Sequence, residues 1–360
     1  MYITSTDKLK EFCDNLQSAE VLVVDTEFVR ERTYFHRIGL IQVGGGEHFA
    51  AIDPIALPDM TPLLELLKDP KKIKVFHAAR QDLEILVRLC GQVIPPVFDT
   101  QIAAALVGWG TQISFAKIVH KALGKKIHKS ETYTDWCRRP LSDNQIEYAI
   151  DDVRYLMPVY KKIVDRLTRM GRLEWVRGEV MDWEDPKTFA LPDPKKRFMK
   201  IKNLRSLKSR NLTVLQEIAA WREGEAVKRD CLAKAIVRDE TLLEIARKIP
   251  RDTKTLSGIR GMYQKEMSKG GVAILKAIET AMEVAEDDLI ELPESNGHAT
   301  TRGVEELLAA YVQIRSEELK IEPSVLADRK KIHSFVTHFE QKQDIEEHIL
   351  FQGWRKELIG

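Results

Sequence analysis

VLVVDTE, residues 21–27, places four consecutive apolar side chains directly before two carboxylates, Asp25 and Glu27. A continuous apolar run of this kind is typical of a central strand that is covered on both faces of a sheet. Asp25 and Glu27 are two residues apart, so the period of a strand directs both to the same side. Like charges repel each other, and a bound cation would hold them together. Taken alone, however, the pair fits the start of a solvated loop better than a metal site.

The bulk composition indicates a soluble protein with more than one domain. A chain of 360 residues is long enough for two or three domains. The net charge of +1 does not by itself indicate a nucleic-acid partner, so any basic surface must be local. The N-terminal segment lacks an apolar signal core, and no apolar run is long enough to cross a membrane. The four cysteines have no metal-site or disulfide spacing, so we expect a cytoplasmic protein: Cys13, Cys90, Cys137 and Cys231. Nothing resembles a heptad seam, and a monomer is expected.

The first 180 residues alternate between strand and helix patterns. Three strands are predicted at 21–28, 38–45 and 48–54, with Gly44, Gly45 and Gly46 forming the turn between the second and third. Further strands at 73–76 and 97–99 are each followed by a helix, at 81–91 and 100–108. This order predicts an α/β fold, a mixed sheet with helices on its faces that opens with an antiparallel hairpin and continues with parallel strands.

The second half of the chain has only helical patterns. Prolines at 186, 192 and 194 precede the segment 195–210, which carries eight Lys or Arg residues and no acidic residue. A polar stretch at 294–298 separates two helical regions. We therefore expect an α/β domain at 1–185, a basic, proline-containing linker at 186–210, a helical domain at 211–290 and a second helical domain at 303–360.

Two further acidic positions change the interpretation of Asp25 and Glu27. Asp82 lies at the predicted start of a helix, where capping alone would account for it. Ser142 and Gln145 form a capping box that opens a helix over 145–156, which carries Tyr148 and Asp152. Residues at i and i+4 stand on one face of a helix, so the tyrosine and the carboxylate are neighbours.

The register of this helix decides between two acidic pairs. Glu147 and Asp151 also have the i,i+4 spacing, but they continue to Arg154 as an ordinary solvated stripe. Tyr148 and Asp152 lie beside the apolar positions of the helix instead. A carboxylate at the border of a buried face needs a partner, and a metal ion would supply one. Tyr148 and Asp152 are the better functional pair.

In this order the residues resemble the ribonuclease D family of metal-dependent 3′→5′ exonucleases. Asp25 and Glu27 match the first motif of that superfamily, Asp82 the second, and Tyr148 with Asp152 the third. The resemblance extends over nearly the whole chain. Flanking segments carry it further: IGLIQV at 38–43, FDTQIAAAL at 98–106, KSETYTDWCRRPLS at 129–142 and GWRKEL at 353–358.

The resemblance implies a ribonuclease H-like fold and hydrolysis of phosphodiesters with two divalent ions. Carboxylate oxygens suit Mg²⁺ or Mn²⁺ better than zinc. It implies that Asp25, Glu27 and Asp152 hold one ion, that Asp25 bridges to the second, and that Asp82 assists through water. Tyr148 would orient the attacking water, because a tyrosine with an ordinary pKa of about 10 is better suited to orientation than to general base catalysis.

Several other residues are weaker candidates. Thr26, Phe28 and His77 are predicted substrate contacts, although structural roles explain Phe28 and His77 equally well. Asp99 is predicted to be a helix N-cap and not a ligand. A basic stretch before the third motif offers partners for phosphates, although any one of its members fits a solvated face: Lys125, Lys126, Lys129, Arg138 and Arg139.

The helical half resembles the HRDC domain that helicases share with ribonuclease D. LAKAIVRDETLLEIARKIP at 232–250, LSGIRG at 256–261 and the pair Gly270–Gly271 carry this likeness, and 299–332 matches a second such domain more weakly. The resemblance implies auxiliary nucleic-acid binding.

Together with this resemblance, the sequence predicts a 3′→5′ exoribonuclease that releases nucleoside 5′-monophosphates. The resemblance implies tRNA precursors with unpaired 3′ ends as substrates. The alternatives are a DNA-directed exonuclease of the same superfamily and a non-catalytic RNA-binding protein.

Overall fold

The computed structural model describes residues 1–127, 134–292 and 299–359, which form two compact units. The first unit contains Met1–Val29, Ile38–Phe189 and Gly297–Gly360, and the second contains Arg30–Arg37 and Ala190–Asn296. Lys129 and the polar stretch 294–298, both noted in the sequence, lie outside the described residues.

The first unit is built on a six-stranded mixed sheet with the order β1-β4-β3-β2-β5-β6. β3 and β4 are antiparallel, whereas β1 pairs with β4, β2 with β5 and β5 with β6 in parallel. The sheet confirms the predicted hairpin followed by parallel strands, and it includes one short strand that the sequence did not indicate, β1. The strands are β1 (Tyr2–Ile3), β2 (Val21–Val29), β3 (Arg37–Gly45), β4 (His48–Ile52), β5 (Ile73–Phe76) and β6 (Val97–Asp99).

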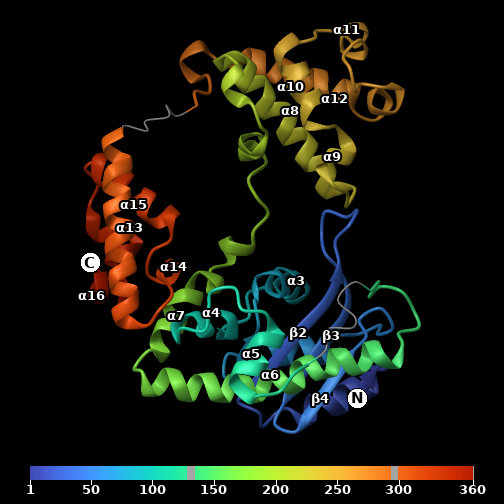
Figure 1. The fold of residues 1–360 in the computed structure, drawn as a ribbon. Coiled ribbons are helices and arrows are strands. Elements are labelled where there is room, and N and C mark those ends of the chain that lie inside the picture. The colour runs from blue at the N-terminus through green and yellow to red at the C-terminus, as the bar shows by residue number, and fades with distance from the viewer. Residues whose placement is uncertain (128–133, 293–298, 360) are drawn as a thin grey trace. The chain divides into compact units, whose positions relative to one another are not determined.

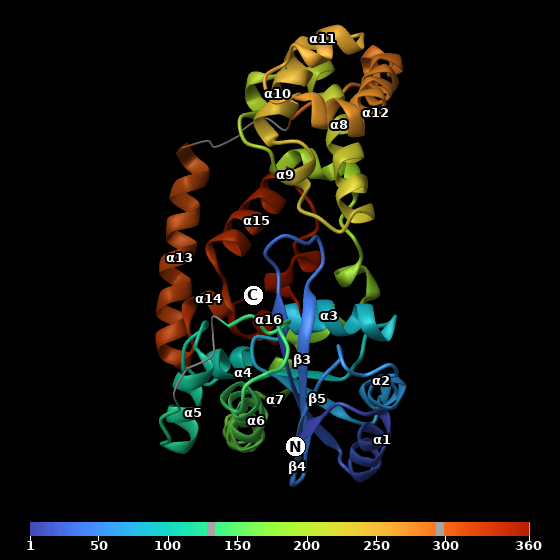
Figure 2. The same ribbon diagram turned by 90° about the vertical axis from the view of Figure 1, so that its right-hand side faces the viewer.

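Helices cover both faces of this sheet (Figure 2). Leu22 and Val24 of β2 pack into the core formed with α1 (Thr6–Asn15), α2 (Thr61–Lys68) and α3 (Arg80–Cys90). Val23 points to the opposite core, formed with α4 (Thr100–Leu106), α5 (Phe115–Leu123) and α6 (Asp143–Arg169). All three side chains have no exposed surface, which explains why residues 21–24 are apolar without alternation.

The turn between β3 and β4 is shorter than predicted. Gly44 and Gly45 belong to β3 and pair with Phe49 and His48, so the prediction of a three-glycine turn is wrong. Of the three glycines, only Gly46, with a φ of 59°, lies in the turn. A side chain at position 44 would collide with the Phe49 ring, so the glycine there makes room for an aromatic neighbour.

The helix that carries the third motif begins as predicted. The Ser142 hydroxyl accepts a hydrogen bond from the Gln145 amide (3.2 Å), and the Gln145 side chain accepts one from the Ser142 amide (2.9 Å). This capping box fixes the first turn of α6 and therefore the rotation of the helix around its axis. Asp151 forms an ion pair with Arg154, as expected for the solvated stripe.

The last helices of the chain pack into the first unit (Figure 1). The Arg355 guanidinium on α16 (Gly353–Ile359) makes two hydrogen bonds, of 2.6 and 2.8 Å, to the Glu179 carboxylate on α7 (Leu173–Val180). Trp354 donates to the same carboxylate (3.1 Å), and its ring stacks on Trp175 with a centroid distance of 4.7 Å. This contact joins the GWRKEL segment to the exonuclease-like region. The other elements of this region are η1 (Met181–Glu184), η2 (Pro186–Phe189), α13 (Ala299–Leu319), α14 (Pro323–Leu326), α15 (Arg329–Glu340), η6 (Ile345–Glu347) and η7 (Ile349–Phe351).

The second unit is helical and centred on α8 (Ser209–Lys228). Phe198 and Ile201, from the basic segment before α8, are buried in its core. Glu223 of α8 is buried, forms an ion pair with Arg197 (2.8 Å) and accepts a hydrogen bond from the Tyr34 hydroxyl (2.6 Å). The remaining elements are η3 (Pro194–Lys200), η4 (Leu204–Ser206), α9 (Ala233–Ile236), α10 (Asp239–Lys248), α11 (Thr253–Ser257), α12 (Gln264–Glu283) and η5 (Glu286–Asp288).

Among the described residues, none of the helices combines the length and the apolar character that crossing a bilayer requires.

Candidate active site

A cavity of about 200 Å³ lies beside the second half of β2, between the sheet and helices α5 and α6. It brings together six of the residues that the sequence singled out, which come from β2, the end of β5 and α6. Three apolar residues that the sequence did not single out complete its wall. The lining residues are Asp25, Thr26, Glu27, His77, Phe115, Ile127, Tyr148, Asp152 and Leu156.

Three carboxylates converge in this cavity. One oxygen from each of Asp25, Glu27 and Asp152 lies within 4.8 Å of the others. The alternation of β2 directs Asp25 and Glu27 to the same face, and the capped register of α6 directs Asp152 towards them. Their donor atoms are all carboxylate oxygens, which is the ligand type preferred by Mg²⁺ and Mn²⁺. The group therefore fits a hard divalent cation.

The pKa values of these carboxyl groups are raised by burial and by their mutual repulsion. Burial, followed by the Asp152 carboxylate, raises the pKa of Asp25 well above its ordinary value. Burial, followed by the charges of Asp25, Asp152 and Asp82, raises the pKa of Glu27 to about 9. A bound cation removes this penalty, because it binds the ionised form of each carboxylate.

These shifts predict how stability depends on pH when no metal is bound. The folded protein keeps the Glu27 proton up to a pH of about 9, whereas the unfolded chain releases it near the ordinary value of 4.5. Between these values the folded state binds more protons, so its stability falls as the pH rises. We expect the Tm in EDTA to fall from about pH 5 to pH 8, and Mg²⁺ to raise the Tm more at the higher pH.

The control for this prediction is Glu27→Gln, which removes the titrating group but keeps its shape. In EDTA the Tm of this variant should fall less steeply with pH than the Tm of the parent. Equal slopes for the two proteins, measured by scanning calorimetry, would contradict the assignment of the proton to Glu27.

Asp82 approaches the cluster from the other face of the sheet. It lies in the first turn of α3, only 6% of its surface is exposed, and its carboxylate accepts a hydrogen bond from the Thr26 hydroxyl. Burial, followed by the Asp25 charge, raises the pKa of Asp82 well above its ordinary value. Asp82 is therefore close enough for the Asp25 charge to raise its pKa. It does not belong to the group of three carboxylates that lie within 4.8 Å of one another. Thr26, predicted to contact substrate, lines the cavity and also donates this hydrogen bond to Asp82.

Tyr148 and His77 both line the cavity, whereas Phe28 is not among its described lining residues. The Tyr148 ring lies 6.1 Å from the ring of Trp136, centroid to centroid. His77 is held by both ring nitrogens: Nδ1 is 3.0 Å from the Thr100 hydroxyl, and Nε2 is 3.0 Å from the Ile113 carbonyl oxygen. This geometry fixes the imidazole plane at the edge of the site.

Asp99 does more than the sequence indicated. As predicted, its side chain caps α4, accepting from the amides of Gln101 (2.6 Å) and Ile102 (3.3 Å). It also accepts from the amides of Ala78 (3.2 Å) and Ala79 (2.8 Å), in the turn between His77 and α3. Ala78 has a φ of 62°, an uncommon value for a residue other than glycine. Asp99 thus holds the turn that positions Asp82, a contact that spacing alone does not reveal.

We expect Asp99→Ala to lower both stability and turnover. The substitution leaves buried amides without an acceptor, which should cost roughly 2–4 kcal/mol in the free energy of unfolding. The kcat should fall because the turn that carries Asp82 is no longer fixed. Calorimetry and exonuclease assays would measure the two effects.

Asp252→Ala is the matched control, because Asp252 caps α11 in the second unit by accepting from the Thr255 amide (2.8 Å). It should lower the Tm less and leave kcat unchanged. The role of Asp99 in positioning Asp82 would be excluded if Asp99→Ala kept the kcat of the parent.

Two family profiles match the chain. The profile described as 3'-5' exonuclease matches residues 1–168, and the profile described as HRDC domain matches residues 211–278. The ribonuclease D of Granulibacter bethesdensis is 36% identical over 362 residues, which cover 99% of this chain and 90% of the relative. The ribonuclease D of Escherichia coli is 34% identical over 365 residues, covering 99% and 96%.

The similarity extends to the folded chain. The crystal structure of Escherichia coli RNase D, described as an exoribonuclease involved in structured RNA processing, matches with a TM-score of 0.88 at 33% identity. The match covers 100% of this chain and 96% of that one. It confirms the predicted fold, a mixed sheet flanked by helices and followed by an HRDC region.

Proposed function

The chain belongs to the ribonuclease D family, and we propose that it is a 3′→5′ exoribonuclease that hydrolyses RNA from its 3′ end with divalent metal ions. The observation that carries this proposal is the convergence of Asp25, Glu27 and Asp152 within 4.8 Å in a cavity that Tyr148 also lines. A phosphodiester is an anion, and three carboxylates alone would repel it. The site therefore needs cations in order to bind its substrate.

We propose specific roles for the acidic residues. Asp25, Glu27 and Asp152 would hold one Mg²⁺ or Mn²⁺ ion, and Asp25 would also help to hold a second. Asp82 would support the second position through water, since it lies beside Asp25 but outside the group of three carboxylates. Bound divalent ions supply charge stabilisation for the attacking and leaving oxygens of such a displacement. Ionised carboxylates are required for this binding, and the raised pKa values of Asp25 and Glu27 imply that binding releases protons.

Tyr148 would orient the water that attacks the terminal phosphodiester. Its position in the wall of the cavity, on the same face of α6 as Asp152, supports this role. A hydroxyl can donate one hydrogen bond and accept others, so it can fix the direction of a water molecule without taking its proton. His77 would contact the substrate or support α4, and its two fixed ring nitrogens favour a rigid position.

The substrate we propose is RNA with an unpaired 3′ end. The cavity is small, about 200 Å³, so the terminal nucleotide must enter it alone and unstacked. Precursors of tRNA are the proposed physiological substrates, from the resemblance to ribonuclease D. The HRDC region at 211–278 would provide auxiliary RNA binding within the helical domain proposed at 211–290. The segment 303–360 would be a second domain of similar type.

The test is a degradation assay with 5′-labelled RNA and DNA of the same sequence. With Mg²⁺ or Mn²⁺, the RNA should shorten one nucleotide at a time from its 3′ end and release nucleoside 5′-monophosphates, and EDTA should stop the reaction. Faster loss of DNA would favour a DNA-directed exonuclease. Tight RNA binding without any shortening would favour a non-catalytic RNA-binding protein.

We also propose that the protein acts as a monomer in the cytoplasm. The spacing of the four cysteines in the sequence is not that of a disulfide framework, which supports a reducing compartment. Light scattering in the presence and absence of RNA would test the oligomeric state.

A further inference from the structure

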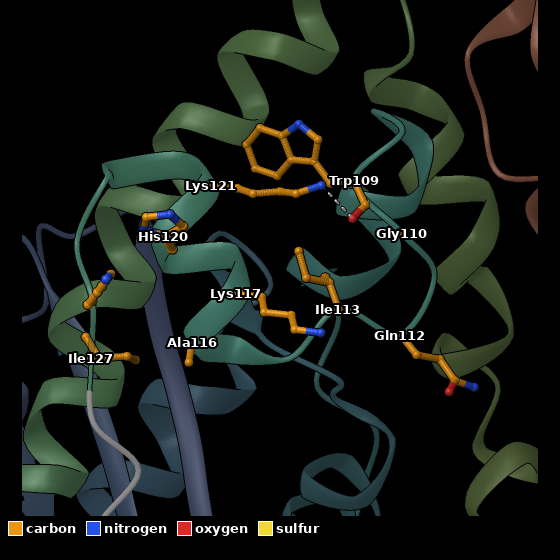
Figure 3. Close-up of a pocket in the computed structure, with 10 residues that line it drawn as sticks. Trp109, Gly110, Gln112, Ile113, Ala116, Lys117, His120, Lys121 and Ile127 are labelled. Carbon is orange, nitrogen blue, oxygen red and sulfur yellow. Dashed lines mark hydrogen bonds between the residues drawn. The ribbon is translucent and has the colours of Figure 1, made fainter.

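A second and larger cavity lies along α5 (Figure 3). It adjoins the catalytic cavity, because Ile127 lines both. Its volume is about 750 Å³, which is within the range of pockets that bind ligands. Its wall comes from the loop between α4 and α5, from α5 itself and from the segment after α5. The residues used below are Trp109, Ile113, Lys117, Lys121, Lys126 and Ile127.

The ionisable side chains described in the lining of this cavity are all basic. Lys117, His120 and Lys121 follow the i, i+3, i+4 spacing on α5, so their side chains form one stripe on its surface. Lys126 adds another ammonium group, and the described lining residues include no carboxylate. A solvated helix face would account for the lysines, but it does not account for the hollow between them and the Trp109 indole.

Trp109 brings an aromatic ring to the same hollow. Figure 3 shows its indole above the side chain of Lys121, whose ammonium group donates to the Trp109 carbonyl oxygen (3.1 Å). The Arg166 guanidinium lies 5.5 Å from the centroid of the indole and adds further positive charge. Cationic groups beside an aromatic ring are the usual surface for single-stranded nucleic acid, because phosphates pair with the cations and bases stack on the ring.

The two cavities share a wall. Ile127 lines both of them. Phe115 lines the catalytic cavity, whereas its neighbours Ala116 and Lys117 line the larger one. The Ile113 carbonyl oxygen lies just before α5 and accepts a hydrogen bond from His77 Nε2 (3.0 Å). His77 lines the catalytic cavity, whereas Ile113 lines the larger one. A strand that leaves the catalytic cavity on this side therefore meets the larger one next.

We propose that this cavity, which we call the α5 pocket, binds the nucleotides that precede the 3′-terminal one in a single-stranded RNA substrate. This inference rests on the proposed exoribonuclease function and names a binding site for the same strand. Lys117, Lys121 and Lys126 pair with backbone phosphates, and Trp109 stacks on a base. The contacts do not depend on sequence, which suits an enzyme that moves along its substrate one nucleotide at a time.

The test compares the double variant Lys117→Ala/Lys121→Ala with the parent on a 5′-labelled single-stranded RNA. The contacts in the pocket are the same in the bound substrate and in the transition state. Their loss should therefore raise KM roughly tenfold, while kcat at saturation stays the same. The slope of log kcat/KM against log salt concentration should become shallower by about 1.4, since each phosphate contact on a single strand contributes about 0.7.

Lys8→Ala/Lys10→Ala is the matched control. It removes the same charge from exposed positions on α1, outside the lining of either cavity, and should change neither KM nor the salt slope. Shorter RNAs give a second measurement. In the parent, kcat/KM should fall as the RNA becomes too short to reach the α5 pocket, and in the double variant this dependence on length should become weaker over the same range.

Three outcomes would overturn the proposal while the parent still degrades RNA. They are an unchanged KM in the double variant, an equal effect in the control, and a loss of kcat that is the same for every RNA length. The absence of RNA shortening by the parent itself would overturn the proposed function instead, so the two failures are distinguishable.

Discussion

Asp25→Asn is expected to lower kcat by at least 1000-fold, which corresponds to roughly 4 kcal/mol in the activation free energy. Asp25 is the residue that both metal positions would share, and an amide keeps one oxygen but loses the negative charge that a divalent ion requires. Loss of this one carboxylate should therefore disturb both positions at once. The measurement is single-turnover hydrolysis of 5′-labelled RNA with Mg²⁺, together with RNA affinity from fluorescence anisotropy.

Stability separates this effect from simple unfolding. In EDTA the Asp25 carboxyl is buried beside Asp152 and its pKa is raised, so a neutral asparagine should leave the Tm equal or higher. Asp151→Asn makes the same chemical change one residue away from Asp152, at a carboxylate that pairs with Arg154, and should keep the parent kcat. An active Asp25→Asn enzyme would exclude the proposed metal site.

Tyr148→Phe should lower kcat roughly 100-fold, within the range that a single positioned side chain contributes to proton transfer and orientation. The ring would remain, so its contact with Trp136 and the shape of the cavity should be preserved. RNA affinity should change little, because the hydroxyl would act on the attacking water and not on the strand. Comparing kcat with the dissociation constant for RNA checks this division.

Tyr155→Phe is the control on the same helix. The Tyr155 ring faces the Lys125 ammonium at 5.3 Å, and phenylalanine keeps that aromatic face, so kcat should not change. If Tyr148→Phe and Tyr155→Phe had the same activity as the parent, the water-orienting role of Tyr148 would have to be abandoned.

The parts of the fold that the sequence predicts are those governed by local chemistry. The apolar run before Asp25 predicts a strand buried on both faces, and Leu22 and Val23 are indeed found in opposite cores. The capping box at Ser142 predicts the start of α6 and, through it, the register of Tyr148 and Asp152. In both cases the signal lies within a few consecutive residues, so spacing is sufficient.

What the sequence does not predict depends on contacts between different elements. Gly44 and Gly45 have the composition of a turn, but the Phe49 ring from the next strand requires the open space at position 44. Asp99 has the spacing of a helix cap, and its bonds to the Ala78 and Ala79 amides join residues 21 and 20 positions apart. The α5 pocket is similarly a product of tertiary structure, since the sequence places Lys126 in a basic stretch but gives no reason to group it with Trp109.

The ion pair between Arg355 and Glu179 determines what a protease that cuts the chain would leave behind. Residues 190–296 are inserted between two stretches of the first unit, and the last stretch is held by hydrogen bonds and stacked indoles as well as by the peptide backbone. A protease that nicks the inserted region would leave two fragments that still belong to one folded body. Electrophoresis under denaturing conditions would then show two fragments. All acidic residues of the nuclease site would lie on the larger fragment, so we expect the nicked protein to keep its activity on RNA.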